Sequence, residues 1–342
     1  VISASHNLFE DNGIKFFNKD GQKFSSELEK RIETKLTQEM IGVESINLGK
    51  AARMSDAQGR YIEFCKSSFT DLDLNGLSIL LDCANGATYS VAPKVFSELG
   101  ANVETIGASP DGININQNCG STSPNALKEA IIKGSYDIGI AFDGDGDRIL
   151  IVTSDGDILD GDDILYILSK EIPANSGVVG TLMTNKALEL YFQNEGIEFS
   201  RADVGDKYVL QRLIERSWVL GGEPSGHIIC LDSAPTGDAI VAALKFLNAT
   251  KDKGFSVEKS LEGFKKFPQT LINLKVNNPN KIIISDKFWE KVTEIELQLG
   301  EDGRVLIRPS GTEPLIRIMV ESKDSGISEN LCNSLADLAQ RI

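Results

Sequence analysis

The most constraining feature of the sequence is a short acidic loop between two apolar runs. The loop reads Asp-Gly-Asp-Gly-Asp-Arg over residues 143–148, and it is flanked by DIGIAF at 137–142 and ILIVT at 149–153. Each run is short, rich in Ile and bounded by turn residues, which predicts two buried β-strands. Three carboxylates in so tight a connection repel one another unless a cation neutralises them. The sequence therefore predicts a divalent metal loop, and oxygen ligands favour Mg²⁺, Mn²⁺ or Ca²⁺ over zinc.

Three alternatives for this loop can be compared on the sequence. An EF-hand would need Gly after the third acid and Glu at the twelfth position, where the chain has Arg148 and Ser154, and strands rather than helices flank the loop. A haloacid-dehalogenase-type phosphatase is closer, because that family places Asp-x-Asp-Gly after an apolar strand, and it would make Asp143 a nucleophile and Asp145 an acid. A solvated acidic turn is the simplest alternative, since Gly and Asp are ordinary turn residues. The loop alone leaves the last two open.

Length and charge limit the classes of protein to consider. A chain of 342 residues is long enough for two or three domains, each with its own core. Its net charge of −15 argues against a nucleic-acid or anionic-membrane partner, because such partners require basic patches. A small phosphorylated ligand stays compatible with this charge, since it needs only a few local cations.

The cysteines indicate the cellular location of the protein, and the start of the chain indicates how much of its first domain is present. The five cysteines show no paired spacing, which fits a reducing cytosol, and no signal peptide or spanning apolar run is visible, so we expect a cytoplasmic protein. Val1 opens directly on a strand end. The helix expected after Ser26, with Glu29 completing a capping box, carries an apolar face over 27–40 that needs a sheet to cover it. We therefore expect that an N-terminal part of the first domain is missing and that this face is exposed.

Strand and helix patterns alternate along most of the chain, which predicts consecutive mixed α/β domains followed by a smaller α+β domain. The expected strands cover 77–81, 101–106, 137–142, 149–153, 177–183, 198–204, 218–220, 270–276, 304–307 and 315–320. The expected helices cover 56–69, 88–99, 124–133, 162–171, 185–195, 206–217, 236–250, 286–299 and 327–341.

Three further polar loops stand at strand ends. The loop at 3–7 offers the hydroxyl of Ser5 as a nucleophile or phosphate carrier, although serine in a turn is most often a turn former, and Lys15 follows inside an apolar strand. Glu223, Ser225 and His227 in the loop 222–227 suit contacts to sugar hydroxyls, although a lone histidine is often structural. The loop 308–314 and Arg317 combine guanidinium groups, hydroxyls and free amides on a glycine turn, which predicts an anion cradle.

Taken together and in this order, the four loops SASHN, DGDGDR, GEPSGH and RPSGTEP resemble those of the α-D-phosphohexomutase family. In that family they are the phosphoserine, metal, sugar and phosphate loops of four domains arranged around a central cleft. The stretches VISASHN, DNGIKFF, DGININ-x-x-CGST and GIAFDGDGDR are more similar to the bacterial branch that acts on glucosamine phosphates than to the mannose and glucose phosphate branches. Leu8 and Pro224 depart from the family pattern, which has Pro and, in the glucosamine branch, Gln.

The resemblance implies a role for each loop. Ser5 would carry the transferable phosphate as phosphoserine, and one of its phosphate oxygens would join Asp143, Asp145 and Asp147 around one Mg²⁺ ion. His6, Lys15 and Arg148 would lie beside the phosphoserine, with Lys15 the candidate for proton transfer. Glu223 and Ser225 would hold sugar hydroxyls, with His227 supporting that loop. The phosphate that is not transferred would be held by Arg308, Ser310, Gly311, Thr312 and Arg317.

The implied reaction interconverts glucosamine 6-phosphate and glucosamine 1-phosphate through a 1,6-bisphosphate intermediate, which feeds amino-sugar and cell-wall precursor synthesis. The implied domains are 1–54, 55–158, 159–268 and 269–342. The expected partner is a small hexose phosphate, and the protein would be a monomer or homodimer. Two alternatives stay open: a phosphomannomutase or phosphoglucomutase of the same fold, and a truncated, inactive sugar-phosphate-binding protein.

Overall fold

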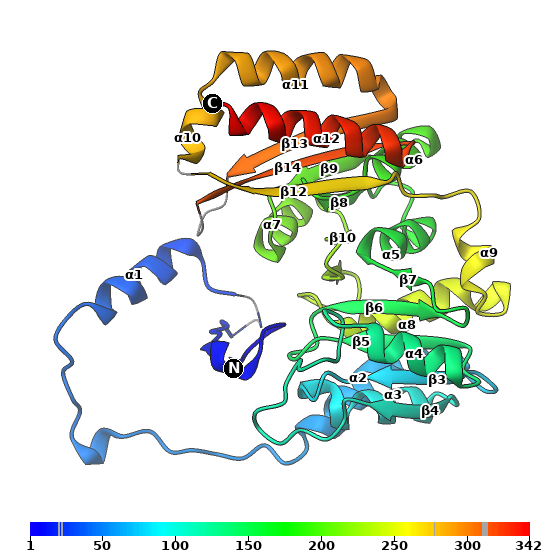
Figure 1. The fold of residues 1–342 in the computed structure, drawn as a ribbon. Coiled ribbons are helices and arrows are strands. Elements are labelled where there is room, and N and C mark those ends of the chain that lie inside the picture. The colour runs from blue at the N-terminus through cyan, green and yellow to red at the C-terminus, as the bar shows by residue number, and fades with distance from the viewer. Residues whose placement is uncertain (20, 22, 277, 310–313) are drawn as a thin grey trace. The chain divides into compact units, whose positions relative to one another are not determined.

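The computed structural model describes residues 1–19, 21, 23–276, 278–309 and 314–342 (Figure 1). Its chain divides into two compact units. Unit 1 comprises residues 1–183 and 198–262, and unit 2 comprises residues 184–197 and 263–342. Among the described helices, none is long and apolar enough to cross a membrane.

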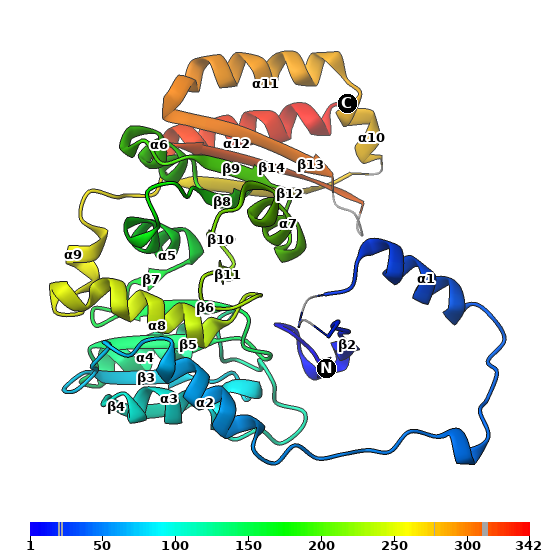
Figure 2. The same cartoon turned by 180° about the vertical axis from the view of Figure 1, so that it is seen from behind.

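The first large sheet of unit 1 carries the acidic loop. Its strand order is β4-β3-β5-β6-β7, in which β4, β3 and β5 are parallel and β5, β6 and β7 are antiparallel. Helix α4 packs on β3, β5 and β6, whereas α8 (Ala239–Thr250) packs on β6 from the face seen in Figure 2. The strands are β3 (Ser78–Asp82), β4 (Asn102–Ile106), β5 (Ile138–Phe142), β6 (Ile149–Thr153) and β7 (Ile158–Leu159), and the helices of this part of the chain are α2 (Ala57–Ser67), α3 (Ala92–Glu98) and α4 (Asn125–Lys133).

The interior of this sheet explains why the acidic loop is fixed. Every residue of β5 is buried, and Leu80, Leu127, Ile131, Ala141 and Val152 form one apolar cluster between the sheet and α4. Removing such side chains from water contributes about 1.5–3 kcal/mol each. The hairpin pairs Phe142 with Ile149, so the loop 143–148 is held at both ends by a packed sheet.

The second sheet of unit 1 has the order β11-β10-β8-β9, with β10, β8 and β9 parallel and β11 antiparallel to β10. Helix α5 begins with a capping box. The Asp160 side chain accepts hydrogen bonds from the N–H groups of Asp162 and Asp163, and the Asp163 side chain accepts one from Asp160 N. Such a box fixes the residue at which a helix begins. The elements are α5 (Gly161–Leu168), β8 (Val178–Thr181), β9 (Phe199–Ala202), α7 (Asp206–Arg216), β10 (Leu220–Gly222), β11 (Ile228–Cys230), α8 (Ala239–Thr250) and α9 (Val257–Leu261).

The N-terminal segment of unit 1 is a two-stranded sheet followed by one helix. Strands β1 (Ile2–Ser3) and β2 (Gly13–Ile14) pair antiparallel, and α1 covers Ser26–Leu36. The predicted capping residue was wrong by one position, because the hydroxyl of Ser25 accepts the hydrogen bond from Leu28 N. The helix ends at Leu36, so Met40 does not belong to it.

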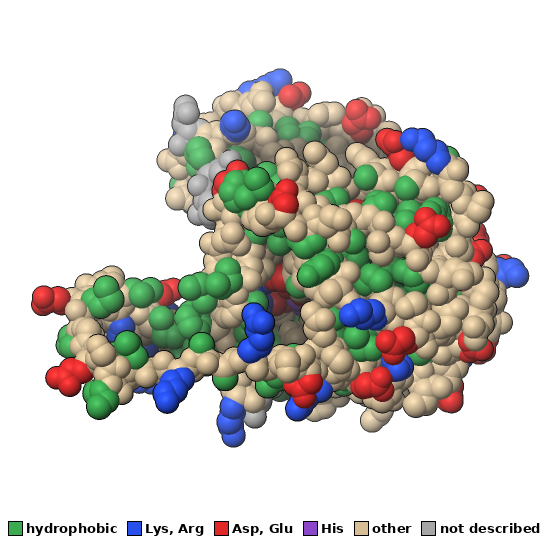
Figure 3. Space-filling model, turned by 90° about the horizontal axis from the view of Figure 1, so that it is seen from below, with side chains coloured by type: hydrophobic (Ala, Val, Ile, Leu, Met, Phe, Trp, Pro, Cys, Tyr) green, Lys and Arg blue, Asp and Glu red, His purple; other side chains and the backbone are tan. Residues whose placement is uncertain are grey.

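Large apolar side chains lie exposed at the end of this helix and after it, and Figure 3 shows apolar side chains at the surface of the N-terminal segment on its left. They are Leu36, Met40, Ile41, Val43, Ile46, Leu48 and Met54. The predicted exposure of the 27–40 face is thus confirmed at its C-terminal end, whereas Leu28 and Ile32 are half-buried.

Unit 2 is an antiparallel sheet covered on one face by two helices. The strand order is β12-β14-β13, and α11 and α12 pack against it and against each other (Figure 1). The core between them contains Phe288, Ile295, Ile316, Ile318 and Leu335. The elements of this unit are α6 (Lys186–Glu195), β12 (Gln269–Lys275), α10 (Pro279–Ile283), α11 (Asp286–Leu299), β13 (Gly303–Pro309), β14 (Leu315–Ser322) and α12 (Ser325–Gln340).

The strands and helices agree with the α/β fold class predicted from the sequence, with three local differences. The helix expected over 88–99 begins only at Ala92, after a 3₁₀ turn, because Pro93 lacks an N–H and suits a first helical turn. The strand expected at 218–220 lies at Leu220–Gly222, since its two glycines sit where side chains would meet neighbouring strands. The strands β7 and β11 and the helices α9 and α10 were not predicted, because strands of two and three residues and helices of five residues are too short to show a repeating apolar pattern.

A buried ion pair ties α6 to the sheet of unit 2. Glu321 is fully buried and accepts hydrogen bonds from Arg304 Nε at 2.6 Å and from Lys186 N at 3.0 Å. We expect Glu321→Ala to lower the free energy of unfolding by about 3–5 kcal/mol, because it removes the buried carboxylate that pairs with this guanidinium group. Urea unfolding followed by Trp289 fluorescence, in a Trp218→Phe background, measures this in unit 2.

The matched control for this prediction is Glu294→Ala, which removes a surface ion pair with Lys291 in the same unit. Its effect should stay within about 0.5 kcal/mol. Equal losses for the two variants would show that the buried pair contributes nothing particular.

Candidate active site

The acidic loop brings three carboxylates together at the carboxyl end of β5. Asp143 is fully buried, and its Oδ1 accepts hydrogen bonds from the backbone N–H groups of Asp147 at 3.0 Å and Arg148 at 3.1 Å. Asp143, Asp145 and Asp147 each offer an oxygen, and these oxygens lie within 4.8 Å of one another.

Each of these three carboxylates also has one buried oxygen that accepts no hydrogen bond from the described residues. Buried atoms Asp143 Oδ2, Asp145 Oδ1 and Asp147 Oδ1 have no hydrogen-bond partner among the residues that the structure describes. Buried polar atoms are otherwise almost always paired. Three such oxygens so close together fit a hard divalent cation such as Mg²⁺.

The charges of the loop support this interpretation. Burial and the neighbouring Asp147 and Asp145 raise the pKa of Asp143 to about 8. Burial alone would also raise the pKa of Asp147, but the neighbouring His227, whose Nδ1 lies 3.7 Å from Asp147 Oδ2, and the charge of Lys15 hold it below its usual range. The loop thus carries crowded negative charge that a cation would relieve.

The Ser5 loop lies directly against the acidic loop. Ser3 Oγ donates to Asp145 Oδ2 at 3.0 Å and accepts from Ser5 N at 2.8 Å, and His6 Nδ1 lies 3.4 Å from Ser5 Oγ. Gly144 is required here, because a Cβ at that position would lie 2.5 Å from Ser5 O. Two segments 142 residues apart in the chain are therefore in contact, as the phosphate-carrier prediction for Ser5 needs.

Two cations accompany these loops. Lys15 Nζ forms an ion pair with Asp145 and lies 3.7 Å from Asp147 Oδ2. Burial lowers the pKa of Lys15, but its hydrogen bond to Asp145 and the charges of the three carboxylates of the acidic loop together outweigh this and raise the pKa overall. Burial and the positive charge of Arg148 lower the pKa of His6. Lys15 and Arg148 thus lie near the Ser5 loop, as predicted.

The predicted sugar loop is joined to the acidic loop. Arg148 and His227 form a β-bridge, and Ile149 N donates to Gly226 O at 3.0 Å. Gly226 has φ +89°, and a Cβ there would collide with Ile149 O, so only glycine fits. His227 Nδ1 lies 3.7 Å from Asp147 Oδ2, which agrees with a supporting role for this buried histidine.

The two side chains predicted to hold the sugar differ in their surroundings. Glu223 is buried, and its Oε1 accepts a hydrogen bond from Gly205 N at 2.9 Å. Ser225 is exposed. One carboxylate oxygen of Glu223 is therefore already used by the protein.

Several contacts at this site were not predicted from the sequence. Lys23 forms an ion pair with Asp206 at the start of α7, and a cavity of about 330 Å³ is lined by these two residues together with Lys15, Asp145 and Asp147. The amide of Asn116 donates to the backbone of the Ser5 loop. No local pattern reveals such contacts, because the partners are far apart in sequence, although Asn116 lies inside the DGININ stretch.

Unit 2 contains the predicted phosphate loop. Arg308 on β13 and Arg317 on β14 are direct cross-strand partners, an arrangement that like charges disfavour in the absence of an anion. Arg317 Nε is buried and has no hydrogen-bond partner among the described residues. The other predicted members of this loop, Ser310, Gly311 and Thr312, lie outside the described residues.

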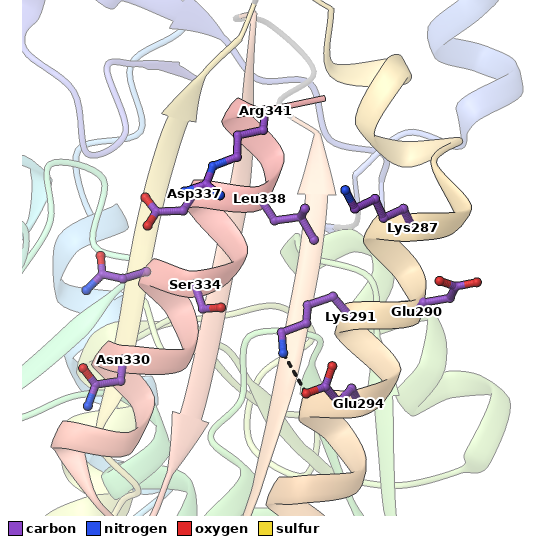
Figure 4. A pocket seen from close by; sticks show the side chains of 10 residues that line it. Lys287, Glu290, Lys291, Glu294, Asn330, Ser334, Asp337, Leu338 and Arg341 are labelled. Atoms are coloured by element: carbon purple, nitrogen blue, oxygen red, sulfur yellow. Dashed lines mark hydrogen bonds and ion pairs between the residues drawn. The ribbon is translucent and has the colours of Figure 1, made fainter.

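A larger groove elsewhere in unit 2 is not a candidate active site. It measures about 630 Å³ and lies between α11 and α12, where Figure 4 shows Lys287, Lys291 and Glu294 on one helix and Asp337 and Arg341 on the other. Basic and acidic side chains alternate there, and Lys291 is paired with Glu294. It presents neither a cluster of one charge nor a buried polar group aimed into it.

Comparison with known families covers nearly the whole chain. Models of the phosphoglucomutase/phosphomannomutase family match residues 1–41 as α/β/α domain I, 59–156 as α/β/α domain II, 160–267 as α/β/α domain III and 271–338 as the C-terminal domain. The chain belongs to this family, so its enzyme class is phosphomutase, an isomerase. The phosphatase alternative for this chain is thereby excluded.

Individual relatives show which members of the family the chain is similar to. A phosphoglucosamine mutase of Legionella pneumophila strain Corby is 50% identical over 351 aligned residues, which cover 100% of this chain and 77% of the relative. A phosphoglucosamine mutase of Aeromonas salmonicida is 51% identical over 347 aligned residues, with the same shares of 100% and 77%.

Solved structures share the fold at low identity. An Aspergillus fumigatus N-acetylphosphoglucosamine mutase, solved with GlcNAc-6P and magnesium, has a TM-score of 0.77 at 17% identity and covers 99% of this chain and 88% of that one. A phosphoglucomutase/phosphomannomutase family protein of Burkholderia thailandensis has a TM-score of 0.77 at 23% identity, with shares of 99% and 76%.

Proposed function

We propose that this phosphomutase interconverts glucosamine 6-phosphate and glucosamine 1-phosphate, with Ser5 as the phosphate carrier. The observation that carries the proposal is the contact between the Ser5 loop and the three-carboxylate loop, through Ser3 and Gly144. The 50% identity to phosphoglucosamine mutases supports the choice of the amino sugar.

The proposed metal is one Mg²⁺ ion held by Asp143, Asp145 and Asp147 together with a phosphate oxygen on Ser5. When bound, it would neutralise negative charge on the phosphoryl group. The three unpaired carboxylate oxygens suit this ion, because Mg²⁺ in proteins takes only part of its six ligands from carboxylates. The remaining places suit a phosphate oxygen and water.

The residues around Ser5 would divide the work of phosphoryl transfer. Ser5 gives its phosphate to one sugar hydroxyl and later regains a phosphate from the other, so a 1,6-bisphosphate forms between the two steps. Lys15 moves a proton at the reacting sugar hydroxyl, and its ion pairs with Asp145 and Asp147 hold the ammonium group beside the site. Arg148 and His6 supply positive charge and a hydrogen bond next to Ser5 Oγ.

The remaining predicted residues would bind the substrate. Glu223 and Ser225 hold sugar hydroxyls, Glu223 through the oxygen that Gly205 N does not use. The paired Arg308 and Arg317, with the loop 310–312, hold the phosphate that is not transferred. The domain boundaries 1–54, 55–158, 159–268 and 269–342, a monomeric or homodimeric state and a cytoplasmic location also remain proposals.

The decisive experiment combines mass spectrometry with substrate comparison. Protein purified from cells should carry one added phosphate on a peptide that contains Ser5, and glucosamine 1,6-bisphosphate should restore it after phosphatase treatment. The kcat/KM for glucosamine 6-phosphate should exceed those for mannose and glucose 6-phosphates by about 100-fold. A higher value for a neutral sugar would assign the protein to another branch of the family. A protein that takes up no phosphate and turns over none of the three sugars would be a binding protein.

A further inference from the structure

The backbone of Ser5 is held in an unusual conformation. Its φ is +52°, in the left-handed region, and Ser5 is not a glycine. A non-glycine residue there costs about 1–2 kcal/mol, so the surrounding structure must hold it. One contact that holds it is the hydrogen bond that Ser5 N donates to Ser3 Oγ at 2.8 Å.

Further contacts come from a single amide side chain far away in the sequence. Asn116 Nδ2 donates to Ser5 O at 2.8 Å and to Asn7 O at 2.7 Å, although 111 and 109 residues separate the partners. Asn116 is buried, with an exposed fraction of 5%. One donor group therefore spans the turn that contains the Ser5 and His6 side chains.

Asn116 is itself rigidly placed. Its φ is +57°, and its N–H donates to Ala84 O at 2.8 Å, in the loop that follows β3. The buried carboxylate of Asp82 anchors that loop, because it accepts from Ala84 N at 3.0 Å and from Gly120 N at 2.7 Å. The position of Asn116 is thus set by the carboxyl end of the sheet that also carries the metal loop.

The three loops meet at one point. A Cβ on Gly144 of the metal loop would lie 2.5 Å from Ser5 O and 2.7 Å from Asn116 Nδ2. The amide of Asn116 therefore fixes the distance between the Ser5 backbone and the carboxylates on either side of Gly144. A hydroxyl that must meet both a metal-bound phosphate and a sugar needs this kind of alignment.

We propose that Asn116 is a positioning residue, which holds the Ser5 loop in register with the metal loop through two hydrogen bonds to its backbone carbonyls. It touches no reacting atom. The inference rests on the proposed role of Ser5 as phosphate carrier, and it adds a residue that acts on Ser5 from the second domain matched by the family models.

Two substitutions separate hydrogen bonding from space filling. Asn116→Gly keeps the left-handed backbone and removes the amide, whereas Asn116→Asp keeps the shape and replaces the donor by an oxygen that faces two carbonyl oxygens. We expect kcat to fall about 100-fold in both, with Asn116→Asp at least as low as Asn116→Gly, and KM to stay within about threefold. The rate at which the dephosphorylated protein takes phosphate from glucosamine 1,6-bisphosphate should fall in parallel.

The matched control is Asn118→Gly. Asn118 has φ +55° in the same loop and is exposed. Asn118→Gly therefore has the same effect on backbone freedom as Asn116→Gly, but it removes no hydrogen bond to the Ser5 loop. It should leave kcat unchanged. If Asn116→Gly does not fold, Asn116→Asp decides, since its volume and backbone preference match those of Asn.

The outcomes are distinguishable. Wild-type kcat in Asn116→Asp would overturn the inference, because only a filler role tolerates the loss of the donor. If Ser5 carries phosphate and Ser5→Ala is inactive while both Asn116 variants keep wild-type kcat, the inference fails and the proposed function stands. If Ser5→Ala keeps full turnover, the proposed function fails, and the inference fails with it.

Discussion

Substitution of Ser5 by Ala is expected to lower mutase turnover by about 10⁴-fold or more. The hydroxyl is the atom proposed to carry the phosphate, and removal of a covalent nucleophile leaves only the positioning and electrostatic contributions of the site. Turnover is measured as glucosamine 1-phosphate formed from glucosamine 6-phosphate at saturating Mg²⁺ with added 1,6-bisphosphate. The added phosphate in the mass spectrum should disappear from the same variant.

The control for this prediction is Ser154→Ala. Ser154 is exposed in the turn between β6 and β7, so the change removes a hydroxyl from the same unit without touching the proposed site. It should keep both turnover and the phosphate. Residual activity of Ser5→Ala above about 10% would show that the phosphate is carried elsewhere.

The local features of the fold followed from the sequence to a large extent. The apolar runs 137–142 and 149–153 predicted the hairpin β5–β6 because burial on both faces leaves few alternatives for short Ile-rich segments. Charge repulsion favoured a metal loop between them but left a solvated acidic turn open, and the unpaired oxygens of the loop agree with the metal prediction. The predicted N-cap of α1 was wrong by one residue, because Ser25 and Ser26 both carry a hydroxyl that can cap a helix.

The long-range contacts of the site could not be predicted from residue patterns. Lys23 meets Asp206 and Asn116 meets Ser5 because separate loops converge at the ends of their sheets, and nothing in the local sequence specifies which partners meet. The order of the four loops placed Ser5 beside the acidic loop only through the family resemblance. Glu223 was predicted to hold sugar hydroxyls, and the hydrogen bond that its Oε1 accepts from Gly205 N is a further long-range contact that the sequence did not indicate.

Substitution of Asp143 by Asn is expected to change stability with opposite signs in the absence and presence of Mg²⁺. Without metal, the buried carboxylate is destabilised by burial and by Asp147 and Asp145, which raise its pKa to about 8. A raised carboxyl pKa means that folding stability is lost as pH rises from about 4, the pKa in the unfolded chain, to about 8. Above that range, the Asp143→Asn variant should therefore unfold with a free energy about 1 kcal/mol or more above that of the metal-free wild type.

With saturating Mg²⁺, the order should reverse. The wild-type protein gains about 2.7 kcal/mol when the ion is present at 100 times its dissociation constant, and the variant gains less because it has lost a ligand. Turnover should fall about 1,000-fold. Thermal unfolding with EDTA and with Mg²⁺, at a pH above about 8, measures both signs in one experiment.

Asp82→Asn is the control that separates a metal ligand from a structural carboxylate. Asp82 is also buried, and its two oxygens accept backbone N–H groups from Ala84 and Gly120, so an amide there must turn its NH₂ toward a donor. We expect it to lower stability equally with and without Mg²⁺. If Asp143→Asn behaves in this way too, Asp143 is a structural carboxylate, and the crowding of the three acids in the loop needs another explanation than a metal ion.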